Sequence, residues 1–410
     1  MAAMVIIGGG KAGSRAAVAL RENGYEGSIT LITGEIHAPY DRPPLSKAVI
    51  TDIDHPLPPF LTDEATLKSI NVDLVAGVAA QSIDRAEHSV TLADGRAIAY
   101  DKLLLATGAQ PRRLNIPGSD SPKVCYLRTY EDSLALRAAL IEGRHIIIIG
   151  GGFIGLEVAS SARKRGASVT VIEGLPRILS RGVPEEVAKI VANRHGAEGV
   201  DIRCSTGLTG FEERGDQIAV LLSDGSAVTG DLVLVGIGAA PVTDLAEKSG
   251  LLIENGIAVD DHLRTTDPEI YAAGDCVSFP LTVYGGRRVR LESWRSAQDQ
   301  GGLAAANMLG KNEPLTTVPW FWSDQYDLTL QIAGLQDEGA ITVRRDLSDT
   351  AFILFHIATD GRLVAASGIG VGNAVAKDVR LAEMIIAKGL KPAPADLADP
   401  AVNMKRLLAG

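Results

Sequence analysis

The stretch VIIGGGKAG, residues 5–13, places three apolar residues directly before a cluster of glycines, and an alanine-rich segment follows it. Gly8, Gly10 and Gly13 have the spacing G-x-G-x-x-G. With this spacing, the first glycine forms a tight turn after a strand, and the second lets the backbone approach a pyrophosphate. The third lets the helix pack closely on the strand. The stretch therefore predicts a strand, a dinucleotide-binding turn and a helix.

The same pattern occurs again at IIIIGGGFIG, residues 146–155. Each copy leads to a second apolar segment, at residues 29–33 and 168–172. Each is followed later by an apolar segment that ends in glycine, at residues 103–108 and 232–238. This order of segments is typical of a βαβ dinucleotide fold. The chain is therefore predicted to be an α/β protein with two Rossmann-like dinucleotide-binding domains.

The bulk composition limits the class of protein. The length of 410 residues suggests more than one domain, and the hydrophobic content of 46% is ordinary for a globular protein. The net charge of -10 argues against nucleic acid as a partner. Cys125, Cys204 and Cys276 are far apart, which argues against a disulfide framework or a metal site and suits a reducing cytoplasm. Since no run of about 18 apolar residues occurs, no membrane span is expected.

A third segment favours FAD at the first glycine loop. TTDPEIYAAGDC, residues 265–276, ends an apolar strand in Gly-Asp, where Asp275 can hydrogen-bond the ribityl chain of a flavin. An N-cap role is the alternative for Asp275. Glu35, near the end of the second apolar segment, would accept hydrogen bonds from ribose hydroxyls. Together with Thr107 and Gly108 of LLLATG, these segments resemble the FAD-binding set of the two-dinucleotide flavoprotein disulfide reductases.

The second glycine loop fits a nicotinamide dinucleotide. Glu173 closes the second strand, where a carboxylate accepts from the 2′-hydroxyl of NAD and repels the 2′-phosphate of NADP. NADH is therefore favoured, although Arg177 four residues later leaves NADPH open. The residues expected to contact NAD in this half are Gly150, Gly152, Phe153, Ile154, Gly155, Glu173 and Gly238.

The segment PYDRPPLSK, residues 39–47, contains no cysteine. Disulfide reductases of this superfamily carry a redox-active cysteine pair early in the first domain, and the related NADH oxidases and peroxidases carry a single cysteine. Electrons must therefore leave a flavin of this chain by another route. A flavin accepts two electrons as a hydride and can release them one at a time, as a [2Fe-2S] carrier requires.

Five segments together resemble the NADH-dependent ferredoxin reductases of glutathione-reductase type, which serve Rieske aromatic-ring dioxygenases and bacterial cytochrome P450 systems. The resemblance covers nearly the whole chain, and it implies an enzyme that passes electrons from NADH through FAD singly to a [2Fe-2S] ferredoxin. The segments are PYDRPPLSK (39–47), GGGFIGLE (150–157), YAAGDC (271–276), LESWRSAQDQG (291–301) and PWFWSDQY (319–326).

The resemblance also implies roles for single residues. Lys47 would lie beside the flavin ring, and Glu157 would approach the nicotinamide and pair with Lys47. This chain departs from the family pattern next to Glu35, because it has Thr33-Gly34 where many relatives have Gly-Asp. The further residues implied are Ala12, Ala80, Arg128, Asp275 and Trp294 as FAD contacts, and Trp320 and Trp322 as the aromatic pair near the ferredoxin-facing flavin edge.

Plainer interpretations stand beside these. Lys47 would otherwise be a solvated loop lysine, and Trp320, Phe321 and Trp322 would be ordinary core, since aromatic residues often dominate cores. The histidines His37, His55 and His195 are expected to be surface or loop residues rather than ligands or bases. The arginines Arg287, Arg288, Arg290 and Arg295 would form a docking face for an acidic ferredoxin, or would be solvated and contact FAD phosphates.

The expected domain order follows from these motifs. Residues 1–110 and 237–316 would form the FAD-binding domain, residues 111–236 the NAD-binding domain, and residues 317–410 a C-terminal α+β domain. Asp94-Gly95 and Asp224-Gly225 predict hairpins. In the C-terminal part we expect strands at 340–344, 351–357 and 363–367, a helix at 374–388, and loosely packed helix and loop in the tail at 392–410.

Other functions fit the same motifs. The electron acceptor can be rubredoxin, or a small molecule such as monodehydroascorbate or a quinone. A redox-sensing interaction protein of the apoptosis-inducing-factor kind would also bind two dinucleotides. That class usually carries targeting or basic DNA-contacting segments, and neither is visible in this sequence.

Overall fold

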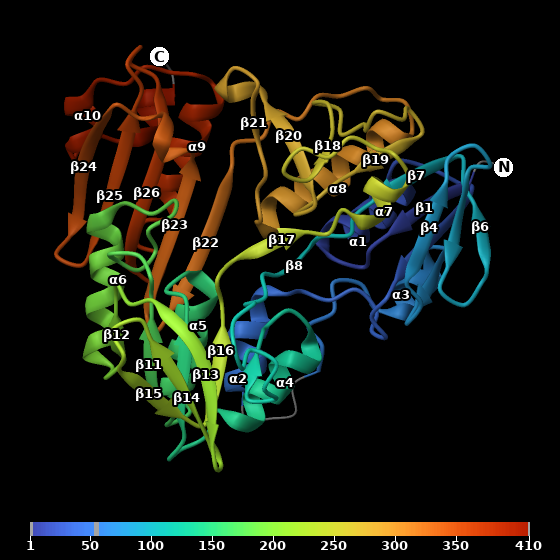
Figure 1. Cartoon of the computed structure of the whole chain (residues 1–410). Helices are drawn as coiled ribbons and strands as arrows, with labels where there is room; N and C mark the ends of the chain where they lie inside the picture. The colour runs from blue at the N-terminus through green and yellow to red at the C-terminus, as the bar shows by residue number, and fades with distance from the viewer. Residues whose placement is uncertain (1–2, 53–56, 409–410) are drawn as a thin grey trace. The chain divides into compact units, whose positions relative to one another are not determined.

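The computed structural model describes residues 3–52 and 57–408, so His55 lies outside the described residues. The chain forms two compact units (Figure 1). No helix within the described ranges is long and apolar enough to cross a membrane. Unit 1 comprises Met1–Asp41, Pro58–Gln110 and Ala240–Pro319, and unit 2 comprises Arg42–Leu57, Pro111–Ala239 and Trp320–Gly410.

Unit 1 is built on a five-stranded parallel sheet with the order β19-β7-β1-β2-β3. The central strands read as continuous apolar runs because they are buried on both faces. Helix α1 (Lys11–Glu22) packs against helix α8 (Trp294–Met308). The strands are β1 (Ala3–Ile7), β2 (Ser28–Thr33), β3 (Val72–Ala76), β7 (Lys102–Leu105) and β19 (Ile270–Ala272).

Unit 2 contains a second parallel sheet with the equivalent order, β12-β11-β10-β16-β9. The registers also correspond, since Ile7 lies opposite Ile32 in unit 1 and Ile149 lies opposite Ile172 in unit 2. The repeat predicted from the two glycine loops is therefore confirmed. The elements are β9 (Val124–Cys125), β10 (His145–Ile149), β11 (Ser168–Ile172), β12 (Asp201–Arg203), β16 (Leu232–Val235), α4 (Tyr130–Ala139), α5 (Phe153–Lys164) and α6 (Glu185–Ala197).

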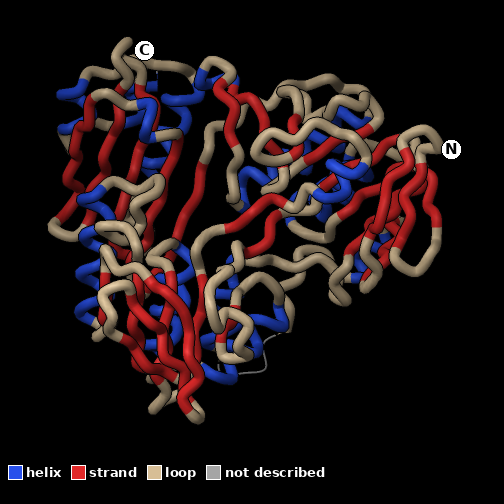
Figure 2. Tube along the Cα trace, viewed as in Figure 1, coloured by secondary structure: helices blue, strands red, loops and turns tan. Residues whose placement is uncertain are grey.

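Each unit also carries a three-stranded antiparallel sheet, and the strands appear in red in Figure 2. Gly95 and Gly225 both adopt a φ of 86° in a turn between strands, so both predicted hairpins are confirmed. The strands are β4 (Ala80–Asp84), β5 (Ser89–Leu92) and β6 (Ala97–Ala99), and β13 (Leu208–Arg214), β14 (Gln217–Leu222) and β15 (Ala227–Gly230). Shorter elements are α3 (Glu64–Ser69), α7 (Asp244–Lys248), β8 (Ala109–Pro111), β17 (Ala239–Pro241), β18 (Ile257–Ala258), β20 (Val277–Leu281) and β21 (Arg287–Val289).

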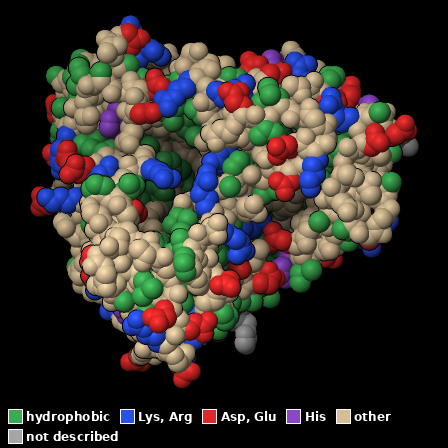
Figure 3. Space-filling view, viewed as in Figure 1, with side chains coloured by type: hydrophobic (Ala, Val, Ile, Leu, Met, Phe, Trp, Pro, Cys, Tyr) green, Lys and Arg blue, Asp and Glu red, His purple; other side chains and the backbone are tan. Residues whose placement is uncertain are grey.

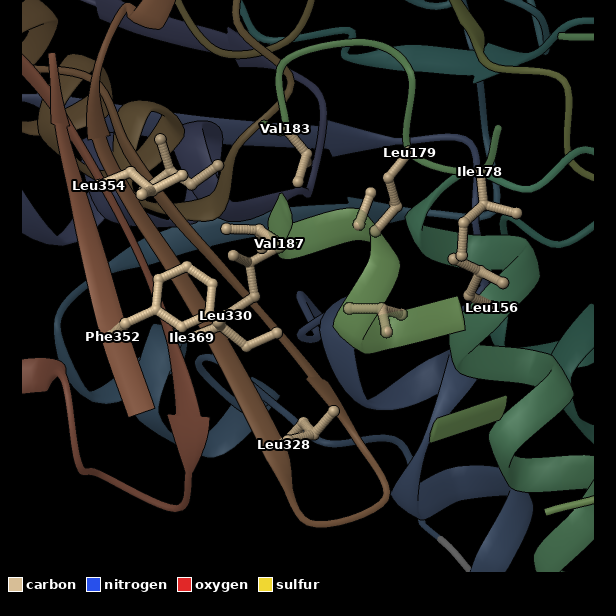
Figure 4. Packing of buried hydrophobic residues seen from close by; sticks show 13 residues of the cluster. Leu156, Ile178, Leu179, Val183, Val187, Leu328, Leu330, Phe352, Leu354 and Ile369 are labelled. Atoms are coloured by element: carbon tan, nitrogen blue, oxygen red, sulfur yellow. The ribbon is translucent and has the colours of Figure 1, made fainter. Parts of the chain in front are cut away.

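The C-terminal part of unit 2 forms an antiparallel sheet with the order β22-β23-β26-β25-β24, on which helix α9 (Ala376–Ala387) packs. The three predicted strands and the helix are confirmed. This sheet shares one apolar core with α5 and α6: Leu330, Phe352 and Ile369 pack with Leu156 and Val187 (Figure 4). The strands are β22 (Trp320–Gln325), β23 (Leu328–Gly334), β24 (Ile341–Ser348), β25 (Ala351–Ile357) and β26 (Leu363–Val371).

The segment Arg42–Leu57 belongs to unit 2, although its neighbours in sequence belong to unit 1. It contains η1 (Pro43–Ser46) and α2 (Ala48–Thr51), which pack against α4 and α5. Side chains of these helices satisfy its backbone, since Ser133 donates to Leu45 O at 2.6 Å and Ser161 donates to Ser46 O at 2.7 Å. The segment Arg42–Leu57 thus lies in unit 2, whereas the rest of the expected range 1–110 lies in unit 1.

The C-terminal tail is packed rather than loose, so this expectation was wrong. Leu397 of α10 (Pro394–Ala398) and Met404 of η4 (Met404–Leu408) are buried. Arg345 of β24 is 3% exposed, and its guanidinium donates to the carbonyl oxygens of four tail residues. The planar five-donor fork of arginine suits several carbonyls at once. These acceptors are Leu397, Asp399, Pro400 and Val402, at 2.6 to 3.3 Å.

The substitution Arg345→Lys should release this tail. Lysine cannot reach all four carbonyls, so buried acceptors lose their donors, at a cost of about 3 kcal/mol. Arg344→Lys is the matched control, because its neighbour Arg344 is exposed and its replacement should cost less than about 1 kcal/mol. Hydrogen exchange of residues 397–402 and chemical denaturation measure both effects. Equal hydrogen-exchange protection of residues 397–402 in the two variants would contradict the role of Arg345 in holding the tail.

Candidate functional site

The first glycine loop is shaped by backbone contacts that leave no room for side chains. Gly8 has a φ of 118°, and a Cβ placed on it would lie 2.0 Å from Ala106 O. A Cβ on Gly13 would lie 1.9 Å from Gly8 O. By contrast, a Cβ on Gly10 would meet nothing within 4 Å. Glycine at 8 and 13 is thus required by the fold, whereas glycine at 10 leaves open space in front of the helix.

The second loop repeats this geometry. Gly150 has a φ of 105°, and a Cβ on it would lie 2.4 Å from Gly236 O. A Cβ on Gly155 would lie 2.3 Å from Gly150 O, and a Cβ on Gly152 would again meet nothing within 4 Å. The two loops therefore offer the same open approach to a backbone turn.

The helices that follow the loops, α1 and α5, begin without a side-chain cap from residues 3–52 and 57–408, and without a nearby negative charge in their first turn. The N-terminal amides and the helix dipole favour an anion at such an end. An open glycine beside an uncapped helix start fits a dinucleotide pyrophosphate in both units.

Asp275 lies beside the first loop. Gly274 has a φ of 89°, its N–H donates to Gln300 Oε1 at 2.7 Å, and a Cβ on it would lie 3.1 Å from that of Ala12. Asp275 occupies the turn between β19 and β20, so it does not cap a helix and the alternative reading was wrong. Thr107 follows β7 and donates to Val242 O at 2.6 Å, next to Gly108 with a φ of 71°. These predicted FAD residues therefore gather at the carboxyl ends of β1, β7 and β19, where α/β sheets bind ligands.

Trp294 is held at the start of α8 by two neighbours in unit 1. Its Nε1 donates to Asp41 Oδ1 at 2.6 Å, and Lys11 Nζ lies 3.9 Å from its ring centroid. Burial lowers the pKa of Lys11, and the charge of Asp41 opposes this shift. The sequence pointed to Trp294 but not to Lys11, although Lys11 lies inside the glycine motif.

The strand register shows that the acidic residues Glu35 and Glu173 do not occupy equivalent positions in the two units. The N–H of Gly8 donates to Ile32 O and that of Gly150 donates to Ile172 O, so Thr33 is the counterpart of Glu173. Glu35 lies two residues further and accepts a hydrogen bond from Tyr40. Ala80 begins β4 and is half-buried in the same unit.

Glu173 is fixed at the second loop by two backbone amides. Its Oε2 accepts from Gly151 N at 2.8 Å and its Oε1 accepts from Leu175 N at 2.8 Å. Arg177 donates to three loop carbonyl oxygens, those of Ile178, Leu179 and Val183. Arg177 is therefore engaged by the protein backbone, which disfavours the phosphate-binding role left open for it.

Lys47 and Glu157 meet within unit 2. Lys47 Nζ lies 2.7 Å from Glu157 Oε2, and Glu157 is 7% exposed. The pairing that the resemblance implied is therefore present, and the solvated-loop reading of Lys47 is wrong. Two further residues, which the sequence did not indicate, also reach Glu157. Ser46 donates to its Oε2 at 2.5 Å, and Ser323 donates to its Oε1 at 2.6 Å.

The aromatic run in β22 is divided between the faces of the strand. Trp320 and Trp322 stack on each other, with ring centroids 5.4 Å apart, and both are only half-buried. Phe321 points the other way, packs on the apolar core and contacts Phe153 edge-on at 5.1 Å. The core reading therefore holds for Phe321 alone.

The remaining predicted residues are scattered over unit 2. Arg128 is half-buried, and its carbonyl oxygen accepts from Arg42. Ile154 and Gly238 are exposed, close to the start of α5 and the end of β16. Unit 1 holds Gly8, Gly10, Ala12, Gly13, Glu35, Ala80, Thr107, Gly108, Asp275 and Trp294, and unit 2 holds Lys47, Arg128, Gly150, Gly152, Phe153, Ile154, Gly155, Glu157, Glu173, Gly238, Trp320 and Trp322.

The expectation for His195 was wrong, because this residue is fully buried in α6, whereas His37 lies half-buried in a loop, as expected. Arg287 and Arg288 are exposed, as expected. Arginines of this cluster form ion pairs, and basic and acidic side chains are interspersed on the face in Figure 3. The ion pairs are Arg288 with Glu254, Arg290 with Glu292, and Arg295 with Asp299.

Comparison with known proteins agrees with this geometry. A family model described as pyridine nucleotide-disulphide oxidoreductase matches residues 2–301, and one described as reductase C-terminal matches residues 320–408. The chain belongs to the pyridine nucleotide-disulphide oxidoreductase family. Within that family it groups with the ferredoxin–NAD(+) reductases, as the resemblance implied.

Three comparisons carry this grouping. The ferredoxin–NAD(+) reductase component of an anthranilate 1,2-dioxygenase system from Burkholderia cepacia is 40% identical over 405 residues, which cover 98% of each chain. A rubredoxin–NAD(+) reductase from Pseudomonas putida is 42% identical over 349 residues, which cover 83% of this chain and 89% of the relative. A crystal structure of the covalent putidaredoxin reductase–putidaredoxin complex matches with a TM-score of 0.91 at 35% identity, covering 100% of this chain and 98% of the other.

The open glycine and the packed glycine of the second loop should respond differently to alanine. Gly152→Ala should leave stability within about 0.5 kcal/mol, because its Cβ meets no protein atom, but should weaken NADH binding at least about tenfold. Gly155→Ala should instead cost roughly 1–3 kcal/mol, because its Cβ overlaps Gly150 O. Thermal denaturation and NADH titration separate these effects. If a folded Gly152→Ala protein bound NADH with unchanged affinity, the assignment of the second loop as the NADH site would be wrong.

Proposed function

We propose that the chain transfers electrons from NADH through FAD, singly, to a [2Fe-2S] ferredoxin that feeds a Rieske oxygenase or a cytochrome P450. The observation that carries this proposal is the Lys47–Glu157 pair. Lys47 of this pair lies in the cysteine-free segment 39–47, and disulfide reductases of this superfamily carry a redox-active cysteine pair early in the same domain. The relative from Burkholderia cepacia, named as a ferredoxin–NAD(+) reductase component, supports the same acceptor class.

The residues of the chain have distinct parts in this activity. A bound flavin supplies the conversion of a two-electron donor into single electrons. The loop of unit 1 holds FAD through Gly10 and the amides of α1, with Asp275 at the ribityl chain. In unit 2, Gly152 and the start of α5 hold the pyrophosphate of NADH. The resemblance implies that Lys47 provides positive charge beside the flavin, and within unit 2 the ammonium of Lys47 is held by Glu157.

The preference for NADH rests on charge at the second loop. Glu173 places a carboxylate beside Gly151, and a 2′-phosphate near it would be repelled. Arg177, which would otherwise neutralise a phosphate, is bonded to loop carbonyls. Both features favour the nucleotide without the phosphate.

The partner surface includes the stacked pair of Trp320 and Trp322. Half-exposed tryptophans are common anchors at protein interfaces, and the pairing with ferredoxin would be transient. The net charge of -10 gives no support for nucleic acid as a partner. The three cysteines are free, which suits a cytoplasmic location.

A rubredoxin is the second candidate acceptor. The relative named rubredoxin–NAD(+) reductase is 42% identical, so the acceptor can differ among chains with this fold. The two acceptors use different iron sites but take electrons one at a time from the same flavin chemistry.

Anaerobic mixing of the FAD-loaded enzyme with NADH should bleach the visible flavin band, and ferredoxin should then be reduced. Trp320→Ala should slow ferredoxin reduction about tenfold, because an interface aromatic is lost, while reduction of a small one-electron acceptor stays unchanged. Stopped-flow absorbance follows both steps. If NADH left the flavin oxidised, the proposed function would fail. Faster turnover with rubredoxin than with ferredoxin would select the second candidate.

Glu173→Gln should shift nucleotide preference toward NADPH. The substitution keeps the shape of the side chain but removes the charge that repels a 2′-phosphate, so the ratio of kcat/KM for NADPH to that for NADH should rise about tenfold. Glu186→Gln, an exposed carboxylate in the first turn of α6, is the control and should leave the ratio unchanged. Steady-state assays with both nucleotides measure the ratio. An unchanged ratio in the Glu173→Gln variant would mean that the selectivity between NADH and NADPH arises at other residues.

A further inference from the structure

A line of buried polar side chains leads from Glu157 into the C-terminal sheet. Ser323 Oγ lies 2.6 Å from Glu157 Oε1, and Gln325 Nε2 lies 3.1 Å from Ser323 Oγ. His195 Nε2 lies 2.8 Å from Gln325 Oε1, and Tyr326 OH lies 3.4 Å from His195 Nδ1. Glu157, Ser323, Gln325 and His195 are all buried. Polar groups in such surroundings are costly unless each is satisfied.

The hydrogen bonds in this line have one consistent direction. A carboxylate only accepts hydrogen bonds, so the hydroxyl of Ser323 must donate its hydrogen bond to Glu157. Ser323 Oγ then accepts from the amide nitrogen of Gln325, which turns the amide oxygen toward His195. His195 must therefore carry its proton on Nε2, which leaves Nδ1 to accept from Tyr326.

The electrostatics of His195 agree with a neutral ring. Burial lowers the pKa of His195, and Arg194 lowers it further, against the opposing effects of the Gln325 hydrogen bond and Glu198. Burial likewise raises the pKa of Tyr326, which keeps its hydroxyl protonated. Arg194 itself is paired with Glu198 and Asp327 and lies over the Tyr326 ring, 4.7 Å from the centroid.

Strand alternation explains why Ser323 reaches Glu157. In β22, residues 321, 323 and 325 point to one face and residues 320, 322 and 324 point to the other. Phe321 packs against Phe153 at the start of α5, and the N–H of Tyr326 donates to Ser160 of the same helix at 3.1 Å. The strand is thereby fixed on both sides of Ser323, along the helix that carries Glu157.

We propose that Ser323, supported by Gln325 and His195, is a positioning residue for the Lys47–Glu157 pair. Three donors hold the Glu157 carboxylate: Lys47 and Ser46 at Oε2, and Ser323 at Oε1. Ser323 thus fixes the rotation of the carboxylate, and through it the place of the Lys47 ammonium. The same strand carries Trp320 and Trp322 on its opposite face, so the proposed partner surface and the charged pair share one rigid element. The inference rests on the proposed function, because it concerns the part that Lys47 has in that reaction.

A double-mutant cycle with Glu157→Gln tests the inference. Ser323→Ala should lower the rate constant for bleaching of the flavin band by NADH about tenfold, which corresponds to the loss of one hydrogen bond to a charged group. In the Glu157→Gln background the same substitution should change this rate constant less than about twofold. Ser323→Thr retains the hydroxyl and should restore most of the rate. Equal effects in both backgrounds, or no effect in the wild type, would overturn the inference.

Ser160→Ala is the matched control. Ser160 is another buried hydroxyl of α5 that contacts the end of β22, but it bonds to Tyr326 N and lies off the line to Glu157. Its replacement should leave the reduction rate within about twofold of the wild type. A tenfold loss in Ser160→Ala would show that packing of the strand, rather than the Glu157 contact, controls the rate.

The tautomer of His195 is a readout that does not depend on turnover. In the ¹⁵N-histidine NMR spectrum of the FAD-loaded protein, His195 should be neutral and protonated at Nε2 even at about pH 6.5, where an unperturbed imidazole is half protonated. A charged ring, or a proton on Nδ1 of a neutral ring, would contradict the direction of the line. A wild-type flavin that NADH does not reduce would defeat the proposed function itself. A reducible wild type with an unaffected Ser323→Ala variant would defeat only this inference.

Discussion

The close approach of backbone to backbone at the two strand–helix junctions is the constraint on which this fold depends. At Gly8 and Gly150 the chain adopts positive φ, and the third glycine of each loop packs against the carbonyl of the first. This contact brings each helix start to the carboxyl edge of its sheet. In unit 1, the uncapped amides of α1 and the turn at Asp275 lie around Gly10. In unit 2, the uncapped amides of α5 and the carboxylate of Glu173 lie around Gly152.

A second constraint acts on the segment Arg42–Leu57. Its short helices cannot bury their own backbone groups, and side chains of α4 and α5 satisfy them instead. Lys47 is carried with the segment to Glu157, 110 positions away in sequence. Because the ammonium meets a buried carboxylate that is already held by two hydroxyls, the pair is fixed in place rather than freely solvated.

The C-terminal sheet contributes in two ways. It completes the core over α5 and α6, and through Ser323 it reaches Glu157. Strand alternation in β22 permits both roles, since Phe321, Ser323 and Gln325 point inward while Trp320 and Trp322 stack on the outer face. A single strand therefore links the charged pair, the core and the proposed partner surface.

The sequence by itself determined the repeated dinucleotide fold, the C-terminal strands and the family, because glycine spacing and apolar periodicity are local properties. It also indicated Glu173, Asp275 and the pair of Lys47 and Glu157 through motifs and resemblance. Only the tertiary structure decided which residues surround them. The burial of His195, the anchoring of the tail by Arg345 and the hydroxyl of Ser323 on Glu157 all depend on segments distant in sequence. No local pattern encodes such contacts, since they form only when the strands and helices have packed.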